Sequence, residues 1–172
     1  MKTVKYAISL LVVGVILTLS GCMPYMQKVE RMPFPEEEYL ALPKMGTGTA
    51  TIRGQAFLKT RSGDVKYAAG TEIFLMPVTS YSNQWYYDSY LPSKPMAKYD
   101  SRYRTYIGIT IGDGEGRFEF LKVPAGDYYL SAKIIWEYVS GGRYPTLTLT
   151  GGVAVKKISV EDGQEIKVIL TR

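Results

Sequence analysis

Histidine is absent from this chain of 172 residues. Histidine is the usual general base beside a serine or cysteine nucleophile, and it is a frequent zinc ligand. Its absence excludes Ser-His-Asp and Cys-His catalytic sites, together with zinc sites that depend on imidazole. Carboxylate pairs of the glycosidase type need no histidine, but no spacing singles out a pair here. The carboxylates available for such a pair are Asp88, Asp100, Glu115, Glu119 and Glu137. We therefore expect a protein that is not an enzyme and that binds no cofactor.

The chain also has a single cysteine, Cys22, and only a modest excess of positive charge. A lone thiol cannot form a disulfide within the chain, so the hydrophobic core alone must hold the domain together. The formal net charge is +5, and the longest basic cluster is the pair Lys156-Lys157. Nucleic-acid binding requires a much larger basic surface. We expect no nucleic-acid partner.

Long hydrophobic runs are missing as well. The uncharged apolar run from Tyr6 to Leu19 has about 14 residues, whereas a membrane-spanning helix needs about 20. Lys2 and Lys5 precede the run, and small residues follow it. A charged start, an apolar centre and a small-residue end are typical of a secretory signal peptide. The alternatives are a transmembrane helix and an ordinary secretory signal followed by a coincidental cysteine.

The last four residues of this segment, Leu19-Ser20-Gly21-Cys22, resemble the lipobox of a bacterial lipoprotein signal. The resemblance implies cleavage between Gly21 and Cys22, loss of residues 1–21 as a signal-peptide helix, and fatty acyl chains such as palmitate on Cys22. More than one acyl chain makes membrane attachment stable. By the same resemblance, Met23 in place of an aspartate after the cysteine implies an outer-membrane location. We expect a mature protein that is lipid-anchored in the bacterial cell envelope.

Residues 22–46 are expected to form the lipidated cysteine and an extended tether. Prolines at high density favour extended backbone and interrupt helices. As a flexible coil, the tether would span about 27 Å root-mean-square. A short helical turn around Glu36–Leu42 is compatible with this composition. The prolines of the segment are Pro24, Pro33, Pro35 and Pro43.

Residues 47–172 show the alternation of apolar and polar residues that is typical of β-strands. The longest alternating run extends from Tyr128 to Tyr138, and Gly-containing turns separate the runs, with Gly151-Gly152 among them. The phase slips by one residue at Lys156-Lys157, which suggests a β-bulge. Strands with one apolar face must cover that face. We predict an all-β, antiparallel β-sandwich of about seven strands, with a partly open barrel as the alternative. Further alternating runs are Ala50–Leu58, Ile107–Ile111, Phe118–Phe120, Leu147–Leu149 and Ile166–Leu170.

Three segments of this region resemble a carboxypeptidase regulatory-like domain, a transthyretin-like or Ig-like sandwich. Ile52–Ala56 resembles its first strand, and Ala68–Leu75 resembles the "small-Gly-Ala-x-Val-x-Leu" strand. The most specific match is Gly116–Leu130, which resembles "Gly-x-Phe-x-Phe…Val-Pro-x-Gly-x-Tyr-x-Leu". The resemblance covers residues 47–172 and implies a folding or binding module without peptidase chemistry. The chain departs from the family pattern by an insertion at residues 78–104.

The insertion is unusually rich in aromatic residues. Tyrosine and tryptophan give a large contact area at low conformational-entropy cost, and they dominate binding hot spots. Aromatic rings also stack on sugars, and long loops in compact domains are often functional. The alternative is that the rings fold back over the sandwich and form a satellite core. The candidate binding residues are Tyr81, Trp85, Tyr86, Tyr87, Tyr90, Tyr99 and Tyr103.

These features favour a non-enzymatic, lipid-anchored β-sandwich that binds an envelope protein through the aromatic loop. One alternative is a lipoprotein that binds carbohydrate, either peptidoglycan or a surface glycan. Another is a structural lipoprotein subunit of an envelope or secretion assembly. A small hydrolase is the least favoured hypothesis. Asp113 and Glu115 lie in a glycine-rich segment where carboxylates could bind Ca²⁺, but a plain hairpin turn is the preferred interpretation, and no metal is expected.

Overall fold

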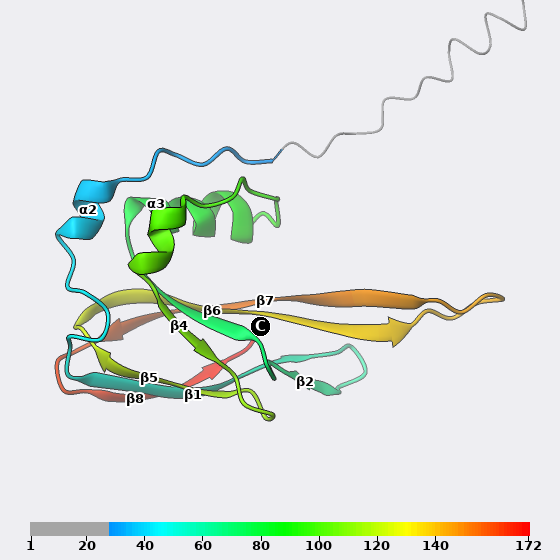
Figure 1. Cartoon of the computed structure of the whole chain (residues 1–172). Helices are drawn as coiled ribbons and strands as arrows, with labels where there is room; N and C mark the ends of the chain where they lie inside the picture. The colour runs from blue at the N-terminus through cyan, green and yellow to red at the C-terminus, as the bar shows by residue number, and fades with distance from the viewer. Residues whose placement is uncertain (1–27) are drawn as a thin grey trace, which may run out of the picture.

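The computed structural model describes residues 28–172, so the predicted signal peptide and lipidated Cys22 lie outside the described residues. Two four-stranded sheets pack face to face (Figure 1), which confirms the predicted all-β sandwich. The strands are β1 (Ala50–Lys59), β2 (Val65–Tyr67), β3 (Glu72–Pro77), β4 (Gly108–Ile111), β5 (Arg117–Val123), β6 (Gly126–Val139), β7 (Leu147–Val160) and β8 (Glu165–Leu170). The helical segments are α2 (Glu36–Leu40), α3 (Ser80–Gln84), η1 (Trp85–Tyr90) and η2 (Ser101–Thr105).

The first sheet is built around β1. Strand β5 pairs with β1 antiparallel, β8 pairs with it parallel, and the short β2 pairs with its last three residues, Phe57–Lys59. The structure thus has one strand more than predicted, because β2 spans only three residues and carries no detectable alternation. The parallel pair β1–β8 is the exception to the antiparallel pattern.

The second sheet has the antiparallel order β4-β3-β6-β7. Strands β6 and β7 pair in one continuous register, from the pair of Gly126 with Val160 to the pair of Val139 with Leu147. The predicted turn at Gly151-Gly152 and the predicted bulge at Lys156-Lys157 are therefore both wrong. Gly151 continues the strand because only glycine fits there: a Cβ would lie 2.1 Å from the Ile134 carbonyl oxygen, and its φ is +147°.

The main core lies between the two sheets and follows the predicted alternation. Its fully buried members include Ile52, Leu75, Leu130 and Leu170. Gly54 lets the strands approach closely, since a Cβ there would lie 2.3 Å from the Val168 carbonyl oxygen and 2.6 Å from the Phe118 ring. The close packing explains why a glycine occupies this position in the first strand.

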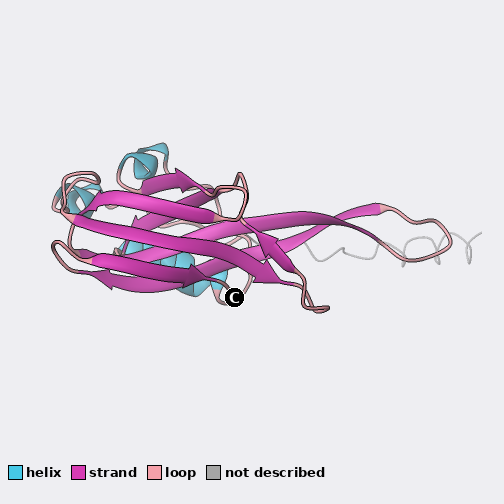
Figure 2. Cartoon of the chain, turned by 90° about the horizontal axis from the view of Figure 1, so that it is seen from below, coloured by secondary structure: helices cyan, strands magenta, loops and turns pink. Residues whose placement is uncertain are grey.

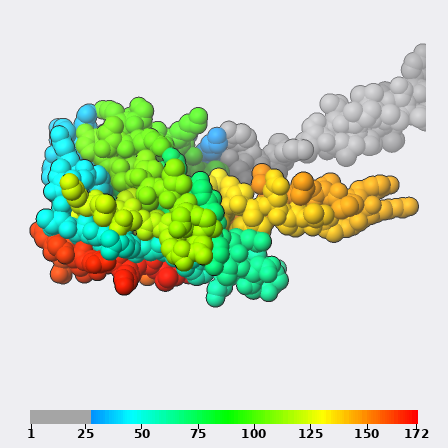
Figure 3. Space-filling model, turned by 60° about the horizontal axis from the view of Figure 1, so that its bottom comes forward, coloured from blue at the N-terminus to red at the C-terminus, as the bar shows by residue number. Residues whose placement is uncertain are grey.

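Strands β6 and β7 continue beyond the sandwich as a two-stranded projection, which we call the arm and define as residues 135–151. Strand β3 pairs with β6 only as far as Ile73 and Ala132, so among residues 28–172 no further strand pairs with the arm on either side. Figures 1, 2 and 3 show the arm extending well past the ends of the other strands.

Residues 28–45 pack on the domain, so the expectation of an extended tether does not hold for this part of the chain. Val29 forms a parallel bridge with Met96, and Tyr39 of α2 is completely buried. Helix α2 confirms the suggested helical turn. The segment folds back because its apolar side chains, Phe34 and Tyr39 above all, find partners in the insertion. Within residues 28–172, no helix is long and apolar enough to cross a membrane.

Candidate functional site

The insertion folds over the outer face of the second sheet, the face turned away from the first sheet, as Figure 1 shows. Thr79 fixes its start with a capping box. The Thr79 hydroxyl accepts a hydrogen bond from the Ser82 amide at 3.2 Å, and the Ser82 hydroxyl accepts one from the Thr79 amide at 2.9 Å. The insertion is therefore a folded layer rather than an open loop.

A second hydrophobic cluster, which we call the outer core, joins the insertion to the sheet. Tyr81 and Tyr103 lie inside it, with ring centroids 5.3 Å apart in an edge-on arrangement. Tyr39 of α2 packs edge-on against Tyr103, with ring centroids 5.8 Å apart. Tyr81 and Tyr103 of the insertion are therefore structural, as the satellite-core alternative predicts. The buried members of the outer core are Tyr39, Met76, Tyr81, Tyr103, Ile107 and Tyr129.

The remaining aromatic residues of the insertion differ in exposure. Trp85, Tyr86 and Tyr90 are half-buried and stack on one another or on the sheet. The Tyr86 ring, for example, stacks on Tyr129 of β6 with centroids 4.7 Å apart. Tyr87 and Tyr99 are 60% and 43% exposed. Of the seven predicted binding residues, the five that are not buried are Trp85, Tyr86, Tyr87, Tyr90 and Tyr99.

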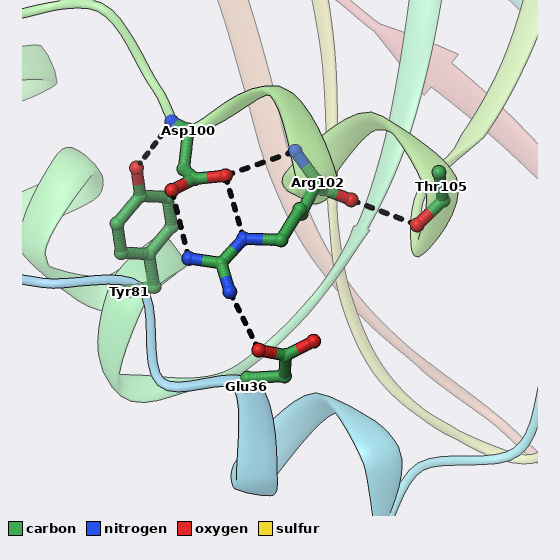
Figure 4. A network of polar contacts seen from close by, with 5 residues as sticks. All are labelled: Glu36, Tyr81, Asp100, Arg102 and Thr105. Carbon is green, nitrogen blue, oxygen red and sulfur yellow. Dashed lines mark hydrogen bonds and ion pairs between the residues drawn. The ribbon is translucent and has the colours of Figure 1, made fainter.

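A polar network holds the outside of this layer in place (Figure 4). Arg102 of η2 contacts Asp100 at 3.0 Å and Glu36 of α2 at 2.5 Å. The Tyr81 hydroxyl accepts a hydrogen bond from the Asp100 amide at 2.9 Å. Hydrogen bonds from Arg102 lower the pKa of Asp100 to about 2. The network also ties the N-terminal segment to the insertion.

A hollow of about 190 Å³ opens between the insertion and the outer face of the sheet, and we call it the aromatic hollow. Trp85 and Tyr99 contribute rings to its wall, and the Ser131 hydroxyl contributes a polar group. Arg31 and Lys133 are its two cations, and no carboxylate lines it among the described residues. The lining consists of Arg31, Phe74, Met76, Trp85, Tyr99, Tyr103, Ile107, Ser131, Lys133 and Val153.

Arg31 is held in a defined position at the aromatic hollow. Its Nε donates a hydrogen bond to the Ala97 carbonyl oxygen at 3.0 Å, and its guanidinium lies 4.8 Å from the centroid of the Tyr81 ring. Burial raises the pKa of the Tyr103 hydroxyl well above its ordinary value, so this wall of the hollow stays neutral. The lining of the hollow thus combines apolar and aromatic side chains with the positive charges of Arg31 and Lys133.

A larger hollow of about 570 Å³ lies next to the first and shares Trp85 and Val153 with it; we call it the edge hollow. Lys94 and Arg172 give it positive charge. Its lining consists of Trp85, Ser89, Tyr90, Leu91, Ser93, Lys94, Pro95, Gly152, Val153 and Arg172.

Sequence reasoning missed the polar half of the site. Composition places Arg31 in the tether, and alternation marks Ser131 and Lys133 only as polar positions of a strand. The signal was present, because the alternation of β6 places both residues on the face opposite Leu130 and Ile134. Recognising it required knowing that the aromatic insertion covers that face.

The glycine-rich segment with Asp113 and Glu115 is a turn, but it is not the hairpin that we preferred, because it joins β4 of the second sheet to β5 of the first and these two strands are not paired. Asp113 Oδ1 accepts hydrogen bonds from the amides of Glu115 at 2.9 Å and Arg117 at 2.8 Å. Arg117 also forms an ion pair with Glu115. Across residues 28–172, no group of three or more acidic or cysteine side chains is placed to hold a metal ion.

Comparisons with known proteins give a relative among solved structures. No family model matches the chain, and no curated protein matches it. The crystal structure of PA1324 from Pseudomonas aeruginosa, described as a "putative carbohydrate binding protein", matches with 32% sequence identity and a TM-score of 0.68 over 83% of this chain and 99% of that one. A 9R-lipoxygenase from Cyanothece matches with 16% identity and a TM-score of 0.30 over 86% of this chain and 18% of that one. Because the sequence identity is above 30% and the match covers most of both chains, this chain belongs to the same family as PA1324.

Proposed function

We propose that this protein is a non-enzymatic carbohydrate-binding module whose sugar site is the aromatic hollow. The observation that carries the proposal is the placement of Trp85 and Tyr99 beside Ser131 and Lys133 around one hollow. Binding sites for small ligands are mostly apolar, with a few convergent polar groups that fix orientation. The C–H face of a sugar ring packs on an aromatic ring, while hydroxyl and cationic groups bind its oxygens. The description of the relative PA1324 as a "putative carbohydrate binding protein" supports this choice over other ligands.

The charges of the site favour an acidic sugar. Arg31 and Lys133 line the hollow without a neighbouring carboxylate in its described lining. A ligand carboxylate or phosphate would supply the missing partner, and arginine binds such groups with two parallel hydrogen bonds. Lys94 and Arg172 extend the positive charge into the edge hollow. A second acidic sugar unit of the same polysaccharide would therefore also lie beside cationic side chains.

We also propose that the module works in the bacterial cell envelope, held by fatty acyl chains on Cys22 at the outer membrane. The support is the sequence Leu19–Cys22, which lies outside the described residues. The resemblance to carboxypeptidase regulatory-like domains is likewise a proposal. In this setting, the ligand would be peptidoglycan or an acidic surface polysaccharide.

A glycan array tests the sugar proposal with the mature chain, residues 22–172. The array carries peptidoglycan fragments together with neutral and acidic bacterial polysaccharides. The Tyr99→Ala variant should lose at least tenfold in affinity for the bound glycan. The Tyr67→Ala variant is the matched control, because Tyr67 is a tyrosine with the same exposure of 43% on the distant strand β2. Equal affinities of the two variants would reject this site.

Binding of an envelope protein is the second candidate function. The observation in its favour is the exposure of Tyr87 and Leu91, 60% and 54%, on the outer surface of the insertion. Crosslinking in intact envelopes should capture a partner with the wild-type protein and not with a Tyr87→Ala/Leu91→Ala variant. Capture by both proteins would remove the insertion as the contact surface.

A further inference from the structure

The arm presents an unusual concentration of exposed aliphatic side chains on one face. Residues paired across a β-ribbon share a face, so Val139 and Leu147 lie side by side, and Glu137 and Leu149 form the next such pair. Ile135 continues the same face toward the sandwich. The aliphatic side chains are between 49% and 71% exposed. Isolated exposed apolar residues are common, whereas a contiguous patch of them marks an interaction surface.

The opposite face of the arm is different. Trp136 packs against the main core, and Tyr138 pairs with Thr148. The charged residues of the arm are Arg143 in the loop at its tip and Glu137, which lies on the aliphatic face beside Leu149. Tyr144 near the tip is 82% exposed. The arm is therefore an amphipathic ribbon with an aliphatic face, a polar and aromatic face, and two free edges.

The described chain begins against the part of the insertion that borders the base of this arm. The Val29 amide donates a hydrogen bond to the Pro95 carbonyl oxygen at 2.8 Å, and the Ala97 amide donates one to the Val29 carbonyl oxygen at 2.9 Å. Pro95 lines the edge hollow together with Gly152 and Val153, where the arm leaves the sandwich. Figure 1 shows the first described residues along the outer side of the insertion, which lies between them and β7.

The aliphatic face also points to the side from which the chain emerges. Along β6, Ile135 follows Lys133 on the face that the insertion covers, opposite the core face of Ile134. Val29 reaches the domain through residues 95–97 of that same insertion. The insertion and the aliphatic face of the arm therefore lie on one side of the sheet.

The distance from this point to the proposed anchor is short. Six residue steps separate Cys22 from Lys28, and a fully extended chain covers about 20 Å over that number of residues. Because residues 28–45 are packed on the domain, they add nothing to this reach. An acylated Cys22 would keep Lys28 within about 20 Å of the bilayer surface, on the side of the sheet that carries the aliphatic face of the arm.

We propose that the aliphatic face of the arm docks on the lipid bilayer, in the interfacial layer beside the anchor; this inference rests on the proposed lipidation of Cys22. Tyrosine favours the interfacial layer, which suits the exposed Tyr144 near the tip, and water there satisfies the backbone groups of the free edges. Lys28, Lys94 and Lys98 are next in sequence to the contacting residues Val29, Pro95 and Ala97, and their positive charge suits anionic headgroups. Docking would orient the domain and hold the aromatic hollow close to the membrane, toward sugars at its surface.

The single thiol provides a test that does not depend on lipidation in the cell. Unacylated mature chain is coupled through Cys22 to maleimide-lipid vesicles of phosphatidylethanolamine and phosphatidylglycerol, and hydrogen–deuterium exchange is measured with and without coupling. Exchange of the amides in residues 135–151 should slow at least tenfold on coupling. The Leu147→Ser/Leu149→Ser variant should lose this protection. The control Ile169→Ser changes a side chain of similar exposure, 53%, on the other sheet and should keep it.

Two results would overturn the inference. Unchanged exchange of the arm on coupled vesicles would mean that the arm stays in water. Equal slowing in lipid-free solution at high protein concentration would mean that a second copy of the chain covers the arm. Exchange of β1 and β3 reports whether a variant remains folded. Failure of the anchor itself is detected separately, by mass spectrometry of Cys22 from cell envelopes.

Discussion

The Tyr39 hydroxyl lies 2.6 Å from Thr79 Oγ1, and this contact joins helix α2 to the capping box that starts the insertion. Tyr39 also stacks on Phe34 with ring centroids 4.9 Å apart. The N-terminal segment and the insertion thus form one layer over the second sheet. The aromatic hollow lies under this layer, so its shape depends on a segment that composition alone describes as a spacer.

The buried phenol of Tyr39 should make the protein sensitive to alkali. Burial raises the pKa of Tyr39 to about 12 from 10.0. The folded state therefore keeps the proton that the unfolded state loses above pH 10, and stability falls between pH 10 and about 12. The Tyr39→Phe variant should be about 1 kcal/mol less stable at pH 7, where it lacks the hydrogen bond to Thr79. At pH 11.5, where tyrosine ionisation costs the wild type about 2 kcal/mol, the variant should be the more stable protein. Urea unfolding at both pH values measures the crossover, with Tyr67→Phe as the exposed control; a constant difference would contradict the burial argument.

Tyrosines of the insertion should differ in their effect on stability according to burial. Tyr81 is 1% exposed, whereas Tyr87 is 60% exposed. The Tyr81→Ala variant should lose about 3–5 kcal/mol of unfolding free energy, because it opens a cavity in the outer core. The Tyr87→Ala variant should change it by less than about 0.5 kcal/mol. Chemical denaturation gives both values, and similar losses would show that the insertion is not a second core.

Residues 28–45 should stabilise the domain. A chain that starts at Gly46 lacks Phe34 and Tyr39, so it exposes the rings of Tyr81 and Tyr103 to water. We expect its melting temperature to fall by about 10 °C or more relative to a chain that starts at Lys28. Differential scanning calorimetry of the two chains measures the effect. Equal melting temperatures would restore the view of this segment as a tether.

Gly54 should not tolerate a side chain. In the Gly54→Ala variant, the new methyl group would collide with the Val168 carbonyl oxygen, which is backbone and cannot move away freely. We expect a loss of about 3 kcal/mol. Gly114→Ala is the control, since a Cβ at Gly114 meets nothing within 4 Å. If thermal unfolding finds the two variants equally stable, the close approach of β1 and β8 is not required.

Local alternation was sufficient to predict the sandwich. Strand β6 has apolar residues at every second position from Tyr128 to Ile134, and the structure buries them. Alternation could not predict that β7 runs straight through Gly151-Gly152. A glycine pair in a sequence is usually interpreted as a turn, whereas Gly151 is needed here because the neighbouring strand approaches closely. Alternation also could not detect β2, which spans three residues.

The candidate site was only half predictable. The aromatic residues stood out by composition, but burial divides them, and composition says nothing about burial. Arg31 and Lys133 are 102 positions apart in the sequence, and only the fold of the N-terminal segment brings them to one hollow. Contacts between segments so distant depend on tertiary packing, which no local pattern encodes.

Fluorescence of Trp85 tests the proposed sugar site most directly. The chain has two tryptophans, so a Trp136→Phe variant leaves Trp85 as the only emitter. Titration of this variant with the acidic glycan selected on the array should produce a saturable change in emission, and Lys133→Ala in the same background should weaken it at least tenfold. Binding of the glycan without any change in Trp85 emission, at an affinity that Lys133→Ala leaves intact, would contradict the proposed site.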